Sequence, residues 1–165
     1  YYCYFIIQGY NGAAISFIAQ NYGAGRMDRV HRVFWICMGS SVAFCAAFNW
    51  LFAWQSDFFL GFFSNVPMVH HYGTLRMHIV LALQFIASSY EIAGSSLRGM
   101  GKSLTPALMT VFGTCLLRMV WVYVVSPIWR GYDVLMTVYP VSWVVTGLMV
   151  LTAYWLTIRK KTMKA

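Results

Sequence analysis

The stretch "VFWICMGSSVAFCAAFNWLFAWQS" (residues 33–56) contains no Asp, Glu, Lys or Arg. A helix needs about 20 predominantly apolar residues to cross the hydrocarbon layer of a bilayer. Backbone N–H and C=O groups have no water to bond inside lipid, so such a segment must pair them within a helix. This stretch therefore predicts a transmembrane α-helix.

The same pattern recurs along the chain. Of 165 residues, 60% are hydrophobic and only 10% are charged, and the mean hydropathy is +0.62. Soluble domains carry about a quarter charged residues. We therefore predict an all-α, polytopic transmembrane helical bundle of about five spans. Their expected positions are 1–21, 31–54, 76–97, 105–128 and 134–157, followed by a tail at 158–165.

The formal net charge of +8 is unevenly distributed. Cations concentrate after the first, third and fifth spans, and only Arg76 and Arg130 follow the second and fourth. This bias is typical of cytoplasmic loops and predicts a multi-pass plasma-membrane protein (in a bacterium, the inner membrane) with a cytoplasmic C-terminus. It favours membrane lipid over nucleic acid as the partner. The clustered cations are Arg26, Arg29, Arg32, Arg98, Lys102, Arg159, Lys160, Lys161 and Lys164.

Glu91 is one of only four acidic residues and lies inside the predicted span 76–97. An ionised side chain at the bilayer centre costs about 2.5–3.5 kcal/mol or more, and such acids usually face a cavity. Two interpretations remain open. Glu91 either captures a proton or cation that drives function, or bonds to a neighbouring helix as a structural group. Its helical stripe is polar or small throughout: Gln84, Ala87, Ser88, Glu91, Gly94, Ser95 and Arg98.

Arg118 is a second charge inside a predicted span. It lies about 20 Å from the inner face at ~1.5 Å per residue, whereas Glu91 lies about 10 Å from it. This difference in depth argues against an ion pair between them. Arg118 is expected to reach toward the outer side or to brace helix ends, and both a functional and a structural role remain open.

Enzymatic and metal chemistry have little support. No CxxC pair occurs among the four cysteines, and the adjacent His70 and His71 point apart on a helix or strand. No Ser/His/Asp or Cys/His grouping suggests a catalytic site. The glycines of "GAG" (23–25) and "RGMG" (98–101) predict helix-end turns, because neither follows a strand. We expect no catalytic residue, no metal site and no cofactor.

Three motifs resemble the multidrug and toxic compound extrusion (MATE) family. They are "IAQNYGAGRMDRVHR" (18–32), "GSSLRGMGKSLTPALMTVFGTCLLRMVWVYVV" (94–125) and "YPVSW" (139–143). The resemblance implies the last five helices of a twelve-helix, two-lobe transporter, so the remaining N-terminal lobe becomes an expected partner. It also implies an antiporter that exports cationic or amphipathic drugs or metabolites in exchange for Na⁺ or H⁺.

The resemblance also suggests roles for particular residues. Alignment through "LRG" places Glu91 one helical turn from the acid of sodium-type members, where this chain has Ala87. Glu91 is then the expected residue for the coupling cation or proton. The expected substrate cavity comprises Gln84, Ser88, Tyr90, Gln8, Asn11 and Arg118.

Two other functions remain in view. One is a flippase of lipid-linked saccharides from a related family, whose cavity should be richly cationic to hold pyrophosphate. The other is a membrane scaffold subunit, in which Glu91 and Arg118 only hold helices together. The opening "YYCYFIIQGY" has neither a starting Met nor a basic region, which suggests a piece of a longer protein.

Overall fold

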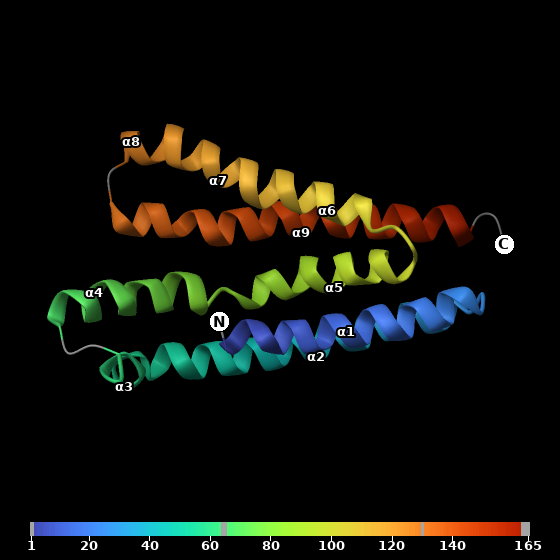
Figure 1. Cartoon of the computed structure of the whole chain (residues 1–165), viewed down its shortest axis with the longest axis horizontal. Coiled ribbons are helices and arrows are strands. Elements are labelled where there is room, and N and C mark those ends of the chain that lie inside the picture. Colours follow the sequence, from blue (N-terminus) through green and yellow to red (C-terminus); the bar gives the residue numbers. More distant parts are fainter. Residues whose placement is uncertain (1, 64–65, 130, 163–165) are drawn as a thin grey trace.

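The computed structural model describes residues 2–63, 66–129 and 131–162, and every regular element in these ranges is a helix (Figure 1). Helix α1 (Tyr2–Gly23) is followed by α2 (Met27–Trp54). The short helices α3 (Ser56–Gly61) and α4 (Pro67–Arg76) come next. The predicted all-α fold is confirmed.

The second half of the chain contains the central helix and a final antiparallel pair. Helix α4 continues into the π-helical segment η1 (Met77–Leu81), and α5 (Phe85–Gly99) follows. One long helix then joins α6 (Leu104–Thr110), η2 (Val111–Leu116), α7 (Leu117–Val120), η3 (Trp121–Val125) and α8 (Ser126–Ile128). The last helix is α9 (Tyr132–Thr162).

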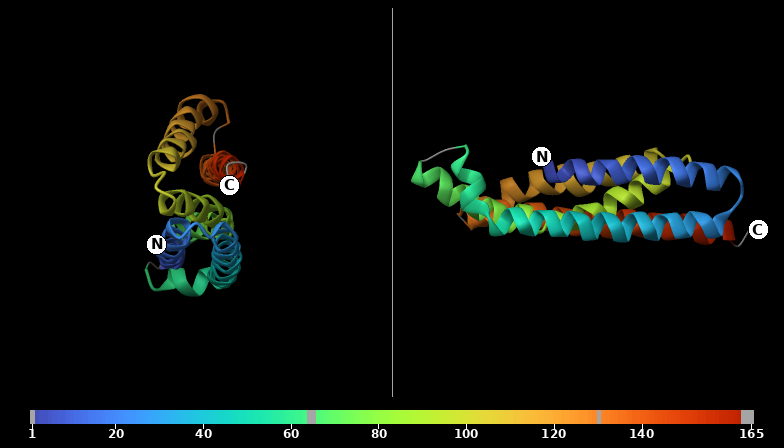
Figure 2. Two further views of the ribbon diagram at one scale, coloured as in Figure 1. Left: turned by 90° about the vertical axis from the view of Figure 1, so that its right-hand side faces the viewer. Right: turned by 90° about the horizontal axis from the view of Figure 1, so that it is seen from below.

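The helices lie side by side in an elongated bundle with α5 at its centre (Figures 1 and 2). Helices α1 and α2 flank α5 on one side and α9 flanks it on the other, while the long helix α6–α8 packs mainly against α9. Ile92, Ala93 and Leu97 of α5 are fully buried in the main apolar cluster. The long helix α6–α8 exposes most of its large apolar side chains, as expected for a surface in contact with lipid.

Several helices are long and apolar enough to cross a membrane, as expected for a polytopic bundle. Three helices of the described chain are long and apolar enough to cross a membrane, or four if the bent pair Pro67–Leu81 and Phe85–Gly99 is one span, against about five expected. Helix α1 is not among them, although it has 22 residues. Its polar residues, among them Gln8, Asn11 and Gln20, lower its hydropathy.

The span predicted at 76–97 is also not a single straight helix. It begins at Pro67 and bends by 45° between η1 and α5. In the π-helical segment the N–H of Ala82 bonds to Met77 O, five residues back, and the next turn uses bonds three residues back. This change of hydrogen-bond register produces the bend without a Pro or Gly at 82–84. The indole Nε1 of Trp50 donates to Ala82 O at 3.1 Å, so a neighbouring helix satisfies the bent backbone.

One end of the bundle is strongly basic. The α1–α2 and α5–α6 turns and the end of α9 all lie there (Figure 1). Gly25 and Gly101 close the two turns with φ of 71° and 79°, which confirms the predicted helix-end turns. The side chains of Arg130, Lys161 and Lys164, and residues 163–165 of the predicted tail, lie outside the described parts. The described cations at the basic end are Arg26, Arg29, Arg32, Arg98, Lys102, Arg159 and Lys160.

Gly99 permits the close approach of α5 to α1. A Cβ added at this position would lie 2.9 Å from the carbonyl oxygen of Ile15 and 3.3 Å from the amide nitrogen of Ala19. Any residue with a Cβ atom would clash with the backbone of α1 where these two helices cross, so this position requires glycine.

We expect Gly99→Val to reduce the stability of the bundle by about 1–3 kcal/mol, the usual effect of overpacking. Thermal unfolding of the purified protein in detergent measures this effect. The control is Gly39→Val in α2, because Gly39 has nothing within 4 Å of an added Cβ. Equal melting temperatures for the two variants would show that the α1–α5 contact is not tight.

Candidate ion-coupling site between α1 and α5

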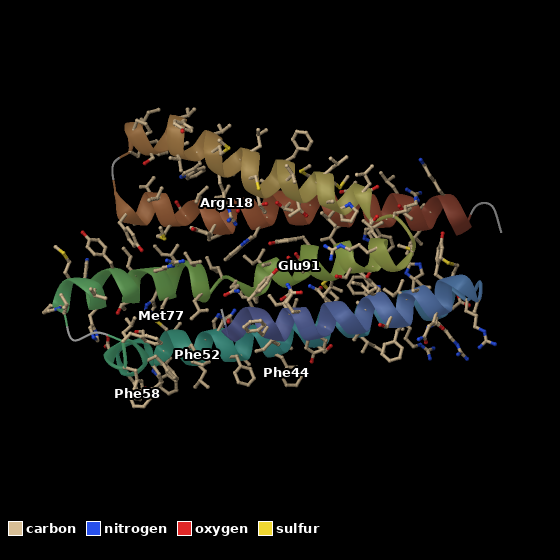
Figure 3. The ribbon with its side chains drawn as sticks, viewed as in Figure 1. Phe44, Phe52, Phe58, Met77, Glu91 and Arg118 are labelled. Atoms are coloured by element: carbon tan, nitrogen blue, oxygen red, sulfur yellow. The ribbon has the colours of Figure 1, made fainter. Side chains whose placement is uncertain are left out.

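Helices α1 and α5 run in the same direction and bring polar side chains together. Tyr4 and Asn11 of α1 both reach Glu91 of α5, and nearer the basic end α1 contacts Gly99. The small residues Ser95 and Gly99 make this approach possible, because bulkier side chains would separate the helices. Figure 3 shows Glu91 on α5, in the middle of the bundle.

Glu91 accepts two hydrogen bonds from α1. Tyr4 Oη donates to Glu91 Oε1 at 3.1 Å, and Asn11 Nδ2 donates to Glu91 Oε2 at 3.1 Å. Asn11 Nδ2 also lies 3.4 Å from Gln8 Oε1, and Ser95 Oγ donates to Asn11 Oδ1 at 2.9 Å. We call Tyr4, Gln8, Asn11, Glu91 and Ser95 the Glu91 network.

The network is buried on one side and open on the other. Asn11 is 4% exposed and Ser95 is fully buried, whereas Glu91 is half-buried and Gln8 is exposed. Both hydrogen-bond donors to Glu91 are neutral, and no Lys or Arg in the described ranges forms an ion pair with it. Within the described ranges, the Glu91 carboxylate therefore has hydrogen-bond donors but no ion-pair partner.

This arrangement suits a small cation. The network offers oxygen atoms from a carboxylate, a phenol and an amide, and hard cations prefer oxygen ligands. A proton on Glu91 would neutralise the same charge. The described site thus has the chemistry to exchange a proton or a hard cation through its open side.

The other residues expected to line the cavity lie in different surroundings. Ser88 is fully buried and Tyr90 is 8% exposed, so both pack between helices in this conformation. Gln84 is half-buried in the bend just before α5. Arg118 contacts α9: its Nε donates to Ser142 Oγ at 3.0 Å, and its Cζ lies 4.5 Å from the centre of the Tyr139 ring.

Several partners of these residues were not predicted from the sequence. Tyr4 was not predicted, although Tyr4, Gln8 and Asn11 follow an i, i+4, i+7 spacing that places them on one helical face. Tyr139 and Ser142 belong to the quoted "YPVSW" motif but were not linked to Arg118. The helical spacing of Tyr4, Gln8 and Asn11 is the signal that could have identified Tyr4 from the sequence.

Together, the fold and the network define a polytopic helical membrane protein with an acid held between two helices. The MatE family model matches residues 1–124. The chain belongs to the MatE family, whose members are membrane transporters rather than enzymes. A search of curated proteins found no match, and a search of solved structures found none either. The matched range includes the Glu91 network and ends before α9.

We expect Tyr4→Phe to lower the stability of the protein by about 0.5–1.5 kcal/mol, the net contribution of one hydrogen bond. The change removes the hydroxyl that donates to Glu91 and keeps the ring. Thermal unfolding in detergent measures it. Tyr10→Phe is the matched control on the same helix, because the Tyr10 hydroxyl makes no hydrogen bond to any described residue. A melting temperature unchanged by Tyr4→Phe would contradict the bond.

Proposed function

We propose that this chain forms part of a secondary active antiporter that exports cationic or amphipathic small molecules in exchange for Na⁺ or H⁺. Glu91 binds the coupling ion, and Gln8 and Asn11 line the adjacent cavity. The observation that supports this proposal is the Glu91 carboxylate, which neutral donors hold between α1 and α5 and which has no ion-pair partner in the described ranges. Intramembrane acids commonly mark ion and proton pathways.

The proposed mechanism begins with a change of charge at Glu91. As a carboxylate, Glu91 only accepts hydrogen bonds, and Tyr4 and Asn11 both donate to it. Protonation would create an O–H donor on Glu91 that needs an acceptor, and a bound cation would compete for the same oxygens. In this proposal Asn11 then rotates, which breaks its bond with Ser95. Ion binding thereby changes how α1 is tied to α5.

Such a local change can bias two global states. Secondary transporters alternate between open states by rocking one bundle against another around a site near the membrane midplane. An ion that binds one arrangement of α1 and α5 more tightly shifts the population toward that arrangement. In this proposal an N-terminal lobe of the same protein completes the cavity.

The proposed orientation follows the charge distribution. The basic end of the bundle lies in the cytoplasm, where its cations contact anionic lipid headgroups. The open side of the Glu91 network faces the cavity shared with the N-terminal lobe. The membrane is the plasma membrane, which is the inner membrane in a bacterium.

Gradient-driven export from vesicles tests the proposal. The full-length protein is reconstituted in liposomes loaded with a fluorescent organic cation, and an inward Na⁺ or H⁺ gradient is imposed. Export should depend on one of the two gradients and stop when a selective ionophore collapses it. Export that is unaffected by both gradients would overturn the antiporter proposal.

A further inference from the structure

Arg118 is the only charged residue in the long helix 104–128. It lies in α7, between the π-helical segments η2 and η3, and is half-buried. π-helical turns are rare and often occur at functional sites, because they redirect side chains. In Figure 3 the Arg118 side chain extends from α7 toward α9, while Glu91 lies on α5.

Two contacts with α9 fix the orientation of the guanidinium. Its Nε donates to Ser142 Oγ at 3.0 Å, and Ser142 Oγ in turn donates to Tyr139 O at 2.8 Å. Its Cζ lies over the Tyr139 ring, 4.5 Å from the ring centre. Helix α9 thus holds one edge and one face of the group through residues that are themselves anchored.

The opposite edge of the guanidinium remains available. An arginine has five N–H donors, of which four are on Nη1 and Nη2. No hydrogen bond joins these four to any residue in the described ranges. Two parallel N–H groups of this kind match the two oxygens of a carboxylate, the geometry that makes bidentate pairs strong and selective.

The positive charge is not balanced within the described chain. Its acids are Asp28, Asp57, Glu91 and Asp133, and none forms an ion pair with Arg118. Glu91 is already bound by Tyr4 and Asn11 of α1. An unpaired cation inside a membrane helix is costly, so its retention points to an anionic partner.

We propose that Arg118, Tyr139 and Ser142 form a receptor for the carboxylate of an amphipathic small molecule. This inference rests on the proposed export function and extends it to compounds that carry an acid, zwitterions among them. Arg118 and Ser142 orient the acid, and the Tyr139 ring offers an apolar surface beside it. Arg118 lies about 20 Å along its helix from Leu104 at ~1.5 Å per residue, deeper than lipid headgroups reside.

A pair of matched probes tests the receptor. One is a cationic xanthene dye as its methyl ester, and the other is the same dye with the free carboxylate. Binding of each to the full-length protein is measured by fluorescence anisotropy in detergent, which needs no ion gradient. Arg118→Gln should weaken binding of the acid about 10-fold or more, as expected for a lost hydrogen bond to a charged group. Binding of the ester should change by less than about twofold.

Further variants keep the result interpretable. Arg118→Lys keeps the charge and loses the planar fork, so it should bind the acid with intermediate affinity. If Arg118→Gln does not fold, Arg118→Lys decides the matter by the same comparison of acid and ester. Equal effects on both probes, or none, would overturn the receptor. Displacement of the acid by added phosphatidylglycerol would identify a lipid headgroup as the occupant and would also overturn it.

The proposed antiporter function fails in a different way. Vesicle export of the ester should be lost in Glu91→Gln whether or not Arg118 binds a carboxylate. Ester export that ignores ion gradients, combined with intact discrimination between acid and ester, would reject the antiporter and keep the receptor. Gradient-driven export without discrimination between acid and ester would reject the receptor and keep the antiporter.

Discussion

Replacing Glu91 by Gln will reduce ion-driven export by the full-length protein to the level of empty vesicles. The substitution keeps the shape of the side chain but removes its negative charge, so no proton or cation can be captured there. In the wild-type chain Tyr4 and Asn11 each donate to one oxygen of the carboxylate. The Gln amide replaces one of these oxygens by an NH₂ group, which faces a donor and cannot accept its hydrogen bond. The measurement is dye efflux under whichever gradient drives the wild-type protein.

The matched control for this variant is Asp133→Asn. Asp133 is an exposed acid in the first turn of α9, remote from the Glu91 network. It should retain export within about twofold, because an acid at a helix N-terminus contributes only about 0.3–1 kcal/mol. Both variants should reach the membrane in normal amounts. Full export by Glu91→Gln would reject the coupling role. A Glu91→Gln variant that fails to fold, rather than one that folds but does not export, would favour the scaffold alternative.

The second large effect is expected for Asn11→Ala. Asn11 is 4% exposed and joins Glu91 to Ser95, so its loss leaves two polar groups without their partner. Leaving a buried group unsatisfied costs about 1–3 kcal/mol. The ion concentration for half-maximal export should therefore shift about 5- to 150-fold.

The ion whose concentration dependence shifts is the coupling ion. If Na⁺ is the coupling ion, loss of the ordered oxygen ligands weakens binding, and more Na⁺ is needed. If H⁺ is the coupling ion, the shift appears in the pH dependence of export instead. The control is Asn21→Ala, because Asn21 bonds only to its own helix at Phe17 O. An unchanged ion dependence in Asn11→Ala would contradict the network.

The fold was predictable because lipid imposes strict rules on backbone bonding. Charge-poor runs such as 33–56 must form helices in a membrane, and α2 and α9 lie where these runs predict. The turns at Gly25 and Gly101 follow from the need for positive φ at helix ends. These features depend on local sequence alone, so one chain is sufficient to infer them.

The bend before α5 was not predictable in this way. The bend at 82–84 depends on a change of hydrogen-bond register, and no Pro or Gly in this segment predicts it. It also depends on the bond from Trp50 of another helix. Helix α1 was expected to be a span from its lack of charge, and it is not among the helices that are long and apolar enough to cross a membrane. The sequence shows the hydropathy of each segment, whereas the bend depends on a contact with another helix.

The candidate site was partly predictable for the same reason. Glu91 is conspicuous as an acid in an apolar run, and Gln8 and Asn11 were identified as polar residues of the first helix. Their contact with Tyr4 depends on which helices pack together, and the sequence of one span does not determine that packing. Arg118 was expected in the same cavity, and its bond to Ser142 of α9 was not predicted.

The most direct test of the central claim measures the ion itself at Glu91. Liposomes containing the full-length protein are loaded with substrate, and the uptake of radioactive sodium or of protons is recorded. We predict that internal substrate stimulates inward movement of one of these ions in the wild-type protein, and that Glu91→Gln abolishes the stimulation. Equal substrate-stimulated ion uptake by the two proteins would contradict the claim that Glu91 couples ion entry to export.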